Sequence, residues 1–201
     1  MHENIVRIRC VKPEIRVLGV DDGVFVPHAK SFAVVVGVVY RGGYWLDGVM
    51  RTEVEIDGFG ATEKIASMIS ASTQYHQLRA VMLSGVTFAG FNVVDIKKLF
   101  ERVRLPVIAV MREKPRFNDI KKAIQNLPEY SKRWEAMENA GEIIEVHTRG
   151  TEQAVYIQIA GISEKDAKKV VKSTSTRSNI PEPLRVAHII ASGLTQPKEN
   201  V

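Results

Sequence analysis

Apolar runs dominate the first quarter of the chain. Residues 15–21 form a short apolar run that ends on Asp21, and residues 32–40 form a longer run rich in β-branched side chains. Runs of this kind are typical of strands that are buried on both faces. Residues 41–43, Arg-Gly-Gly, predict a tight turn, and the alternation over residues 44–56 predicts a strand that pairs back on the previous one. The chain is therefore predicted to begin with antiparallel strands.

The pattern then changes to an alternation of helices and strands. Apolar side chains recur at helical spacing over residues 61–72, and a second helix is predicted to open at Asn92, with Asn92 and Asp95 at its N-cap and N3 positions. The other predicted elements are strands at 79–84, 105–111, 143–146 and 155–159, helices over 117–139 with an interruption at Pro128, a helix capped by Ser163, and a last helix that ends near Gly193.

This order of elements predicts one α/β domain over residues 1–201. Connection rules favour packing the strand at 79–84 beside the strand at 15–21, with the crossover helices on the faces of the sheet. The predicted fold is ribonuclease-H-like: a central mixed five-stranded sheet flanked by helices, with a small additional C-terminal strand pair.

Candidate chemistry gathers where two parallel strands of that layout end. Their carboxyl ends meet at one edge of the sheet, which places Asp21 and Asp22 opposite Ser84 and Gly85. The helix that starts at Ala61 is expected to present Glu63 toward the same point.

Each of these acids also has a structural explanation. Burying an unpaired carboxylate costs several kcal/mol or shifts its pKa, so Asp21 at the end of a buried strand is the best candidate for a functional acid. The alternative is a polar turn formed by Asp21, Asp22 and Gly23. Glu63 is either a metal ligand or an ordinary first-turn glutamate favoured by the helix dipole. No chemistry is assigned to the scattered histidines, and His188 is expected to pack or lie on the surface.

The composition is that of an ordinary globular protein, with 45% hydrophobic and 25% charged residues. No apolar run approaches the ~20 residues that cross a bilayer, and the N-terminus shows no signal-peptide pattern. Cys10 is the only cysteine, which excludes an intrachain disulfide and a cysteine zinc cluster. We expect a cytoplasmic protein without a membrane partner.

Positive charge is concentrated in one segment of the chain. The net charge is +5, and residues 112–133 hold seven basic against three acidic side chains. Such a concentration suits a phosphate backbone, so DNA or RNA is the expected partner. A solvated basic face is the alternative interpretation. The candidate nucleic-acid contacts are Arg112, Lys114, Arg116, Lys132 and Arg133.

Segments along most of the chain resemble endonuclease V, and they occur in the same order as in that family. They are residues 19–21, 56–59 followed by Glu63, 83–89, 105–110 and 180–188. As a whole the chain resembles the archaeal relatives of that family known as domain of unknown function number ninety-nine, whose activity is unassigned. The resemblance covers about residues 15–194 and implies the ribonuclease-H-like fold.

The resemblance also implies a site for a divalent cation, Mg²⁺ or Mn²⁺. Asp21 and Glu63 would be catalytic, Asp21, Asp22 and Glu63 would hold the metal, and the cleft would be formed by Ser84, Gly85, Gly58 and Phe59. The chain also differs from endonuclease V at positions that bear on this site. The acid of the fourth strand is replaced by Ser84, a poorer ligand for Mg²⁺, and the tyrosine of the wedge loop by Glu55. We therefore expect no recognition of deoxyinosine.

Three functions remain open at this point. The preferred one is a nucleic-acid-binding protein with a degenerate or altered divalent-metal site. The second is an active Mg²⁺- or Mn²⁺-dependent nuclease with an altered substrate. The third is a module that binds a small ligand or a protein through the ancestral cleft.

Overall fold

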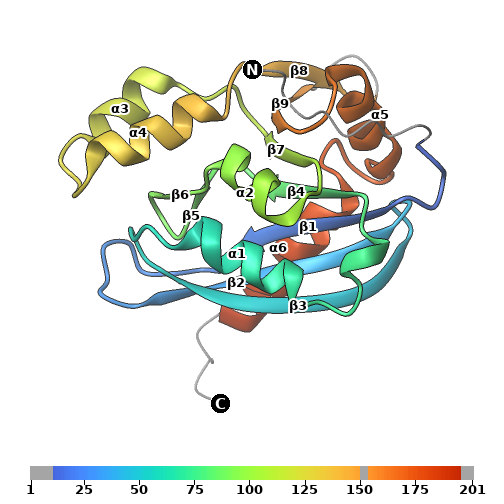
Figure 1. The fold of residues 1–201 in the computed structure, drawn as a ribbon, viewed down its shortest axis with the longest axis horizontal. Helices are drawn as coiled ribbons and strands as arrows, with labels where there is room; N and C mark the ends of the chain where they lie inside the picture. Colours follow the sequence, from blue (N-terminus) through green and yellow to red (C-terminus); the bar gives the residue numbers. More distant parts are fainter. Residues whose placement is uncertain (1–10, 150–153, 196–201) are drawn as a thin grey trace.

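The computed structural model describes residues 11–149 and 154–195. Seven strands form one mixed sheet in the order β3-β2-β1-β4-β7-β9-β8 (Figure 1). Its strands are β1 (Arg16–Asp22), β2 (Phe32–Arg41), β3 (Trp45–Glu55), β4 (Ala80–Ser84), β7 (Val107–Met111), β8 (Ile144–His147) and β9 (Ala154–Ala160). The helices are α1 (Ala61–Ser70), α2 (Ile96–Val103), α3 (Phe117–Ile124), α4 (Tyr130–Asn139), α5 (Glu164–Thr174) and α6 (Glu182–Thr195).

The predicted mixed sheet flanked by helices is confirmed, but it has seven strands rather than five, because the additional C-terminal strand pair joins it. β9 pairs antiparallel with β7, from Val107 opposite Ala160 to Met111 opposite Tyr156, and β8 then pairs with β9. The last two strands therefore extend the central sheet. The physical reason is that β7 would otherwise leave a row of unpaired backbone groups at the edge of the sheet.

β1 lies inside the sheet between β2 and β4, and the strand at residues 79–84 packs beside it as predicted. It pairs antiparallel with β2 and parallel with β4, with Val20 opposite Leu83 in the parallel register. The carboxyl ends of β1, β4 and β7 consequently lie side by side at one edge, where Asp21 and Ser84 are found.

Helices cover both faces of the sheet (Figure 1). α1 and α2 cover one face, where their apolar side chains pack with Leu18 and Val20 of β1. α5 and α6 cover the other face, where Leu184 packs with Val17. No helix among residues 11–149 and 154–195 is long and apolar enough to cross a membrane.

α6 lies in direct contact with β1 because two glycines leave room for its backbone. A Cβ atom added at Gly19 would come within 2.3 Å of the carbonyl carbon of Pro183, and one at Gly23 within 2.7 Å of the carbonyl oxygen of Ala191. The two contacts fix the first turn of the helix and its later part against the same strand. The residues of α6 between them are therefore held over the end of β1.

The expected capping of α2 by Asn92 is wrong. Asp95 is the N-cap, and its Oδ1 accepts hydrogen bonds from the backbone N–H groups of Lys97 and Lys98, at 3.1 and 3.0 Å. Asn92 lies in the small hairpin of β5 (Thr87–Phe88) and β6 (Asn92–Val93), which the sequence did not predict. Its Oδ1 accepts from the N–H of Ala61, 3.0 Å away, so it caps α1 from a distance.

Two other local predictions are confirmed. The basic helical segment divides into α3 and α4 on either side of Pro128. Ser163 is the N-cap of α5, where its Oγ accepts from the N–H of Asp166 at 3.2 Å.

We expect Gly19→Ala to lower the free energy of unfolding by about 3 kcal/mol, because the new methyl group would overlap the backbone of Pro183. Gly193→Ala is the matched control on α6, since no atom lies within 4 Å of a Cβ atom at that position. Alanine there should be neutral or stabilise the helix by up to about 1 kcal/mol. Urea denaturation of both variants measures the difference, and equal effects would contradict a close contact at Gly19.

Candidate functional site

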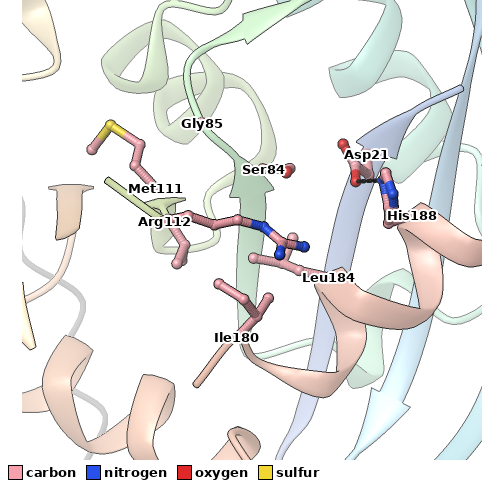
Figure 2. Close-up of a pocket in the computed structure, with 9 residues that line it drawn as sticks. Asp21, Ser84, Gly85, Met111, Arg112, Ile180, Leu184 and His188 are labelled. Carbon is pink, nitrogen blue, oxygen red and sulfur yellow. Dashed lines mark hydrogen bonds and ion pairs between the residues drawn. The ribbon is translucent and has the colours of Figure 1, made fainter. Parts of the chain in front are cut away.

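A cavity of about 260 Å³ lies at the carboxyl ends of β1, β4 and β7, with α6 as its remaining wall (Figure 2). The strands bring Asp21, Ser84 and Arg112 to it from positions far apart in the sequence. The full lining is Asp21, Ser84, Gly85, Val110, Met111, Arg112, Ile180, Leu184 and His188.

Asp21 is the acid of this cavity, and it is paired with His188. The residue is 7% exposed, and its Oδ2 lies 3.1 Å from Nδ1 of His188 (Figure 2). Its Oδ1 accepts from the N–H of Asp22 at 3.0 Å, and the side chain of Ser84 also hydrogen-bonds it. The His188 side chain is 56% exposed, so the imidazole joins a buried carboxylate to the solvent.

The environment of Asp21 holds its pKa far from the ordinary value. Burial is the main cause and the neighbouring Asp22 carboxylate the second, and together they raise the pKa of Asp21 from 3.8 to about 6, although His188 opposes the shift. Burial also raises the pKa of Asp22. The two carboxyls thus form a site where negative charge is incompletely compensated.

Asp22 lies next to Asp21 but has a structural contact of its own. Its Oδ2 accepts from the N–H of Ala89 at 2.7 Å, which ties the β5 segment to the end of β1. The negative charge of Asp22 also acts on Asp21, whose pKa it helps to raise. Of the two expected metal ligands from the end of β1, Asp21 lines the cavity and Asp22 does not, because successive side chains of a strand point to opposite faces.

Glu63 is not brought to them. It lines a different cavity, of about 230 Å³, together with Phe59, Lys132 and Arg133. Its Oε1 lies 3.3 Å from Nη2 of Arg102 on α2, and its side chain is 53% exposed. The helix on which it lies covers the face of the sheet opposite α6.

Arg133 is almost completely buried, with 2% of its surface exposed. Its guanidinium donates hydrogen bonds to the carbonyl oxygens of Gly58, Asp57, Phe91 and Pro128. The ring of Phe59 covers it, with the centroid 4.0 Å from Cζ. Arg133 therefore fixes the loop of Gly58 and Phe59 rather than facing the solvent. Lys132, its neighbour, forms an ion pair with Glu129.

Arg112 lines the Asp21 cavity, and Lys114 lines a neighbouring cavity. Figure 2 shows the Arg112 side chain extending from the end of β7 toward Leu184. Arg112 and Ile180 also line a second cavity of about 470 Å³, which contains Lys114 and Tyr156. Arg116 is exposed beyond these strands and lines neither cavity.

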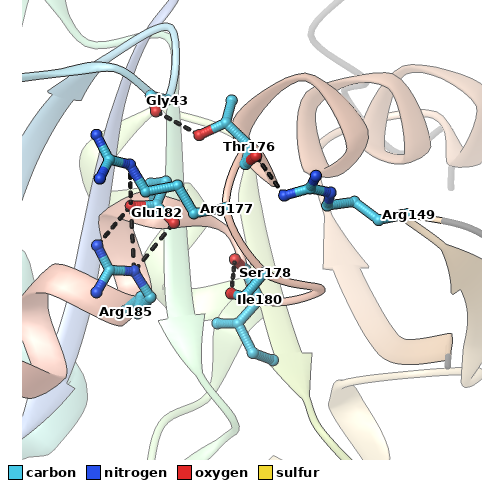
Figure 3. Close-up of polar contacts among 8 residues, drawn as sticks. All are labelled: Gly43, Arg149, Thr176, Arg177, Ser178, Ile180, Glu182 and Arg185. Carbon is cyan, nitrogen blue, oxygen red and sulfur yellow. Dashed lines mark hydrogen bonds and ion pairs between the residues drawn. The ribbon is translucent and has the colours of Figure 1, made fainter.

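The segment that enters α6 is anchored by a buried acid, Glu182 (Figure 3). This side chain is fully buried and accepts from Nε of Arg185 at 3.0 Å and from Nη2 at 2.7 Å. Thr176 in the preceding loop donates to the carbonyl oxygen of Gly43 at 2.7 Å. These contacts hold the start of α6, and hence Leu184 and His188, in place.

The carboxylates at the end of β1 are only part of the donor set that the sequence predicts for a divalent cation. Within residues 11–149 and 154–195, no group of three His, Cys, Asp or Glu side chains is arranged to hold a metal ion. Asp21 and Asp22 remain, and their raised pKa values indicate unmatched negative charge that a cation would offset. Mg²⁺ commonly uses one or two carboxylates and takes its other ligands from water and phosphate. The expected set of Asp21, Asp22 and Glu63 is thus only partly assembled.

His188 is the residue that the sequence did not reveal. Its partner lies 167 positions earlier in the chain, so no local spacing joins the two residues. The helical pattern of the last segment was readable, but its orientation over β1 was not. His188 could be placed at the site only after the contacts of α6 with Gly19 and Gly23 were known.

The comparisons with known proteins agree with the fold. The family model described as Endonuclease dU matches residues 13–195. A protein of Methanothermobacter thermautotrophicus named only as a UPF0215 protein is 50% identical over 188 residues, which are 93% of this chain and 91% of that protein. The crystal structure of a protein of unknown function from Archaeoglobus fulgidus has a TM-score of 0.82 at 38% identity, over 92% of this chain and 100% of that chain.

The expected likeness to endonuclease V is confirmed at the level of the fold. Endonuclease V of Ciona intestinalis, solved with a 24mer DNA containing an inosine followed by a ribo-adenosine, has a TM-score of 0.56 at 15% identity. The superposition covers 87% of this chain and 82% of that one.

We expect Asp21→Asn to stabilise the protein above about pH 6. The raised pKa of Asp21 means that the folded state binds its proton more readily than the unfolded state. The resulting stabilisation is complete below about pH 4 and is lost as the pH rises through about 6, by about 3 kcal/mol at the most. Asparagine carries no such charge, so the variant should gain stability over the wild type only as the pH rises through this range.

Urea denaturation of both proteins between acidic and neutral pH measures this difference. The difference therefore reports the charge of Asp21 together with its interactions with Asp22 and His188. If Asp21→Asn instead lowers the free energy of unfolding by the same amount at every pH, the ionised Asp21 carboxylate does not destabilise the folded state.

Proposed function

Because the chain belongs to the endonuclease dU family, we propose that it binds nucleic acid, with a backbone phosphate at the Asp21 cavity beside an altered divalent-metal site. One observation carries the proposal. Asp21, which is buried and paired with the exposed His188, lines one cavity with the Arg112 guanidinium at the carboxyl ends of the central strands.

Arg112 is the proposed phosphate contact. A guanidinium presents donors in a planar fork that matches two phosphate oxygens, and its charge persists at every physiological pH. Lys114 would contact the next part of the backbone, because it lines the cavity that shares Arg112 and Ile180 with the first. Lys132 and Arg133 are not included, since Glu129 pairs with the first and the second is buried.

Asp21 and Asp22 would repel a phosphate unless their charge is offset. A Mg²⁺ or Mn²⁺ ion next to the two carboxylates would offset it and would polarise a phosphate oxygen. Asp21 and Asp22 would hold the ion, His188 would orient the Asp21 carboxylate, and Arg112 would hold the phosphate. Glu63 could join them only by leaving Arg102.

Cleavage of DNA that contains deoxyuridine is the second candidate, and the description of the family as Endonuclease dU favours it. Asp21 would then be the carboxylate nearest the scissile phosphate. Volume does not decide on a small-ligand module: the Asp21 cavity of about 260 Å³ is below the usual range of such pockets, roughly 300–1,000 Å³, whereas the neighbouring cavity of about 470 Å³ lies within it.

We expect Arg112→Glu to weaken binding to DNA roughly tenfold or more and to lower the slope of log affinity against log salt by about 1. Lys97→Glu makes the same change of charge on α2, which covers the other face of the sheet, and should have a much smaller effect. Fluorescence anisotropy at several salt concentrations measures both variants on matched strands with deoxyuridine or thymidine, and on RNA. Equal effects of the two variants would contradict a phosphate at Arg112.

A cleavage assay distinguishes the nucleic-acid-binding protein from the nuclease. The same strands are incubated with Mg²⁺ and with Mn²⁺, using the wild type and Asp21→Asn. Cleavage that requires the metal and is lost in the variant, while binding persists, would select the nuclease. Binding without cleavage under every condition would select the altered, non-catalytic site.

A further inference from the structure

β3 is the longest strand of the sheet and lies at its edge. It has 11 residues, and among the described residues it pairs with β2 alone. The first part of the strand is covered by Gln74, whose Nε2 donates to the carbonyl oxygen of Asp47 at 2.9 Å. The register with β2 is regular from Val49 to Glu55. These seven residues form an open edge about 23 Å long, at ~3.3 Å per residue.

The direction of the backbone groups on this edge follows from one hydrogen bond. The N–H of Ile56 donates to the carbonyl oxygen of Ser31 at 3.0 Å, so Ile56 points its backbone groups toward β2. Successive residues of a strand point these groups to opposite sides. Val49, Arg51 and Glu53 therefore direct their N–H and C=O groups away from β2, where another strand could pair.

The side chains on this edge are self-complementary in charge. Arg51 and Glu53 lie on the same face of the sheet, with side chains 63% and 50% exposed and an ion pair of 2.6 Å between them. In an antiparallel pairing of two copies centred on Thr52, Arg51 of each copy lies opposite Glu53 of the other. The backbone groups of residues 51 and 53 also point outward. The register centred on Thr52 therefore aligns opposite charges and also aligns the backbone donors and acceptors of the two strands.

We propose that β3 pairs with β3 of a second copy of this chain, antiparallel and around a two-fold axis at Thr52. The sheet then continues across both copies, and the open edge is closed. Edges are commonly protected against pairing by lysines, prolines or bulges, whereas Val49–Glu55 contains no lysine or proline and has a regular register, and its Arg51 and Glu53 carry charges that match in the antiparallel pairing. No residue that lines the Asp21 cavity belongs to β3, so the pairing leaves that cavity accessible.

A charge exchange on the full chain tests this dimer. Arg51→Glu or Glu53→Arg alone places two like-charge pairs across the axis, and each should weaken association roughly tenfold or more. An equimolar mixture of the two variants restores opposite charges at both positions and should form a heterodimer. Sedimentation equilibrium over a wide range of concentration measures all three, and circular dichroism confirms that each variant is folded.

Glu53→Pro is an independent test of the backbone. Proline removes an outward N–H group and is tolerated on an edge strand, so the variant should be folded and monomeric. The proposal is overturned if the wild type is monomeric at every concentration. It is also overturned if the single variants dimerise as well as the wild type, because the interface would then lie elsewhere.

Discussion

The contact of α6 with β1 is the constraint on which the candidate site depends. Glycines at positions 19 and 23 let the helix backbone approach the strand at two points, and His188 lies between them. That placement brings the imidazole within 3.1 Å of the Asp21 carboxyl and makes α6 a wall of the cavity. A larger side chain at either glycine would separate the helix from the strand and the histidine from its acid.

Local features of the sequence predicted the fold well because they have local causes. The apolar run at residues 15–21 became β1 at Arg16–Asp22, and Ser163 caps α5 as its spacing indicated. Features with distant partners were not predictable in the same way. Asn92 caps α1 across 31 residues, and β9 joins β7 because that strand needs a neighbour.

Glu63 illustrates how a family resemblance can conflict with a pattern. The buried side of α1 includes Ile65, Ile69 and Thr62, and Glu63 lies on the exposed side, where it meets Arg102. The helical period alone separates residue 63 from residue 65 by about 200° around the helix axis. The sequence therefore contained the signal that Glu63 points away from the apolar face, although not which neighbour it would meet.

The loss of a third acid changes how a cation could be held at this site. In the proposed site Asp21 and Asp22 would supply two carboxylates, while Mg²⁺ requires near-octahedral coordination and loses its water reluctantly. The remaining ligands must come from water or from the phosphate of a bound nucleic acid. Binding of cation and nucleic acid would then be mutually dependent, because each lowers the electrostatic cost of the other beside the two carboxylates. A cation bound in this way would depend on the nucleic acid more strongly than a cation with a complete set of protein ligands.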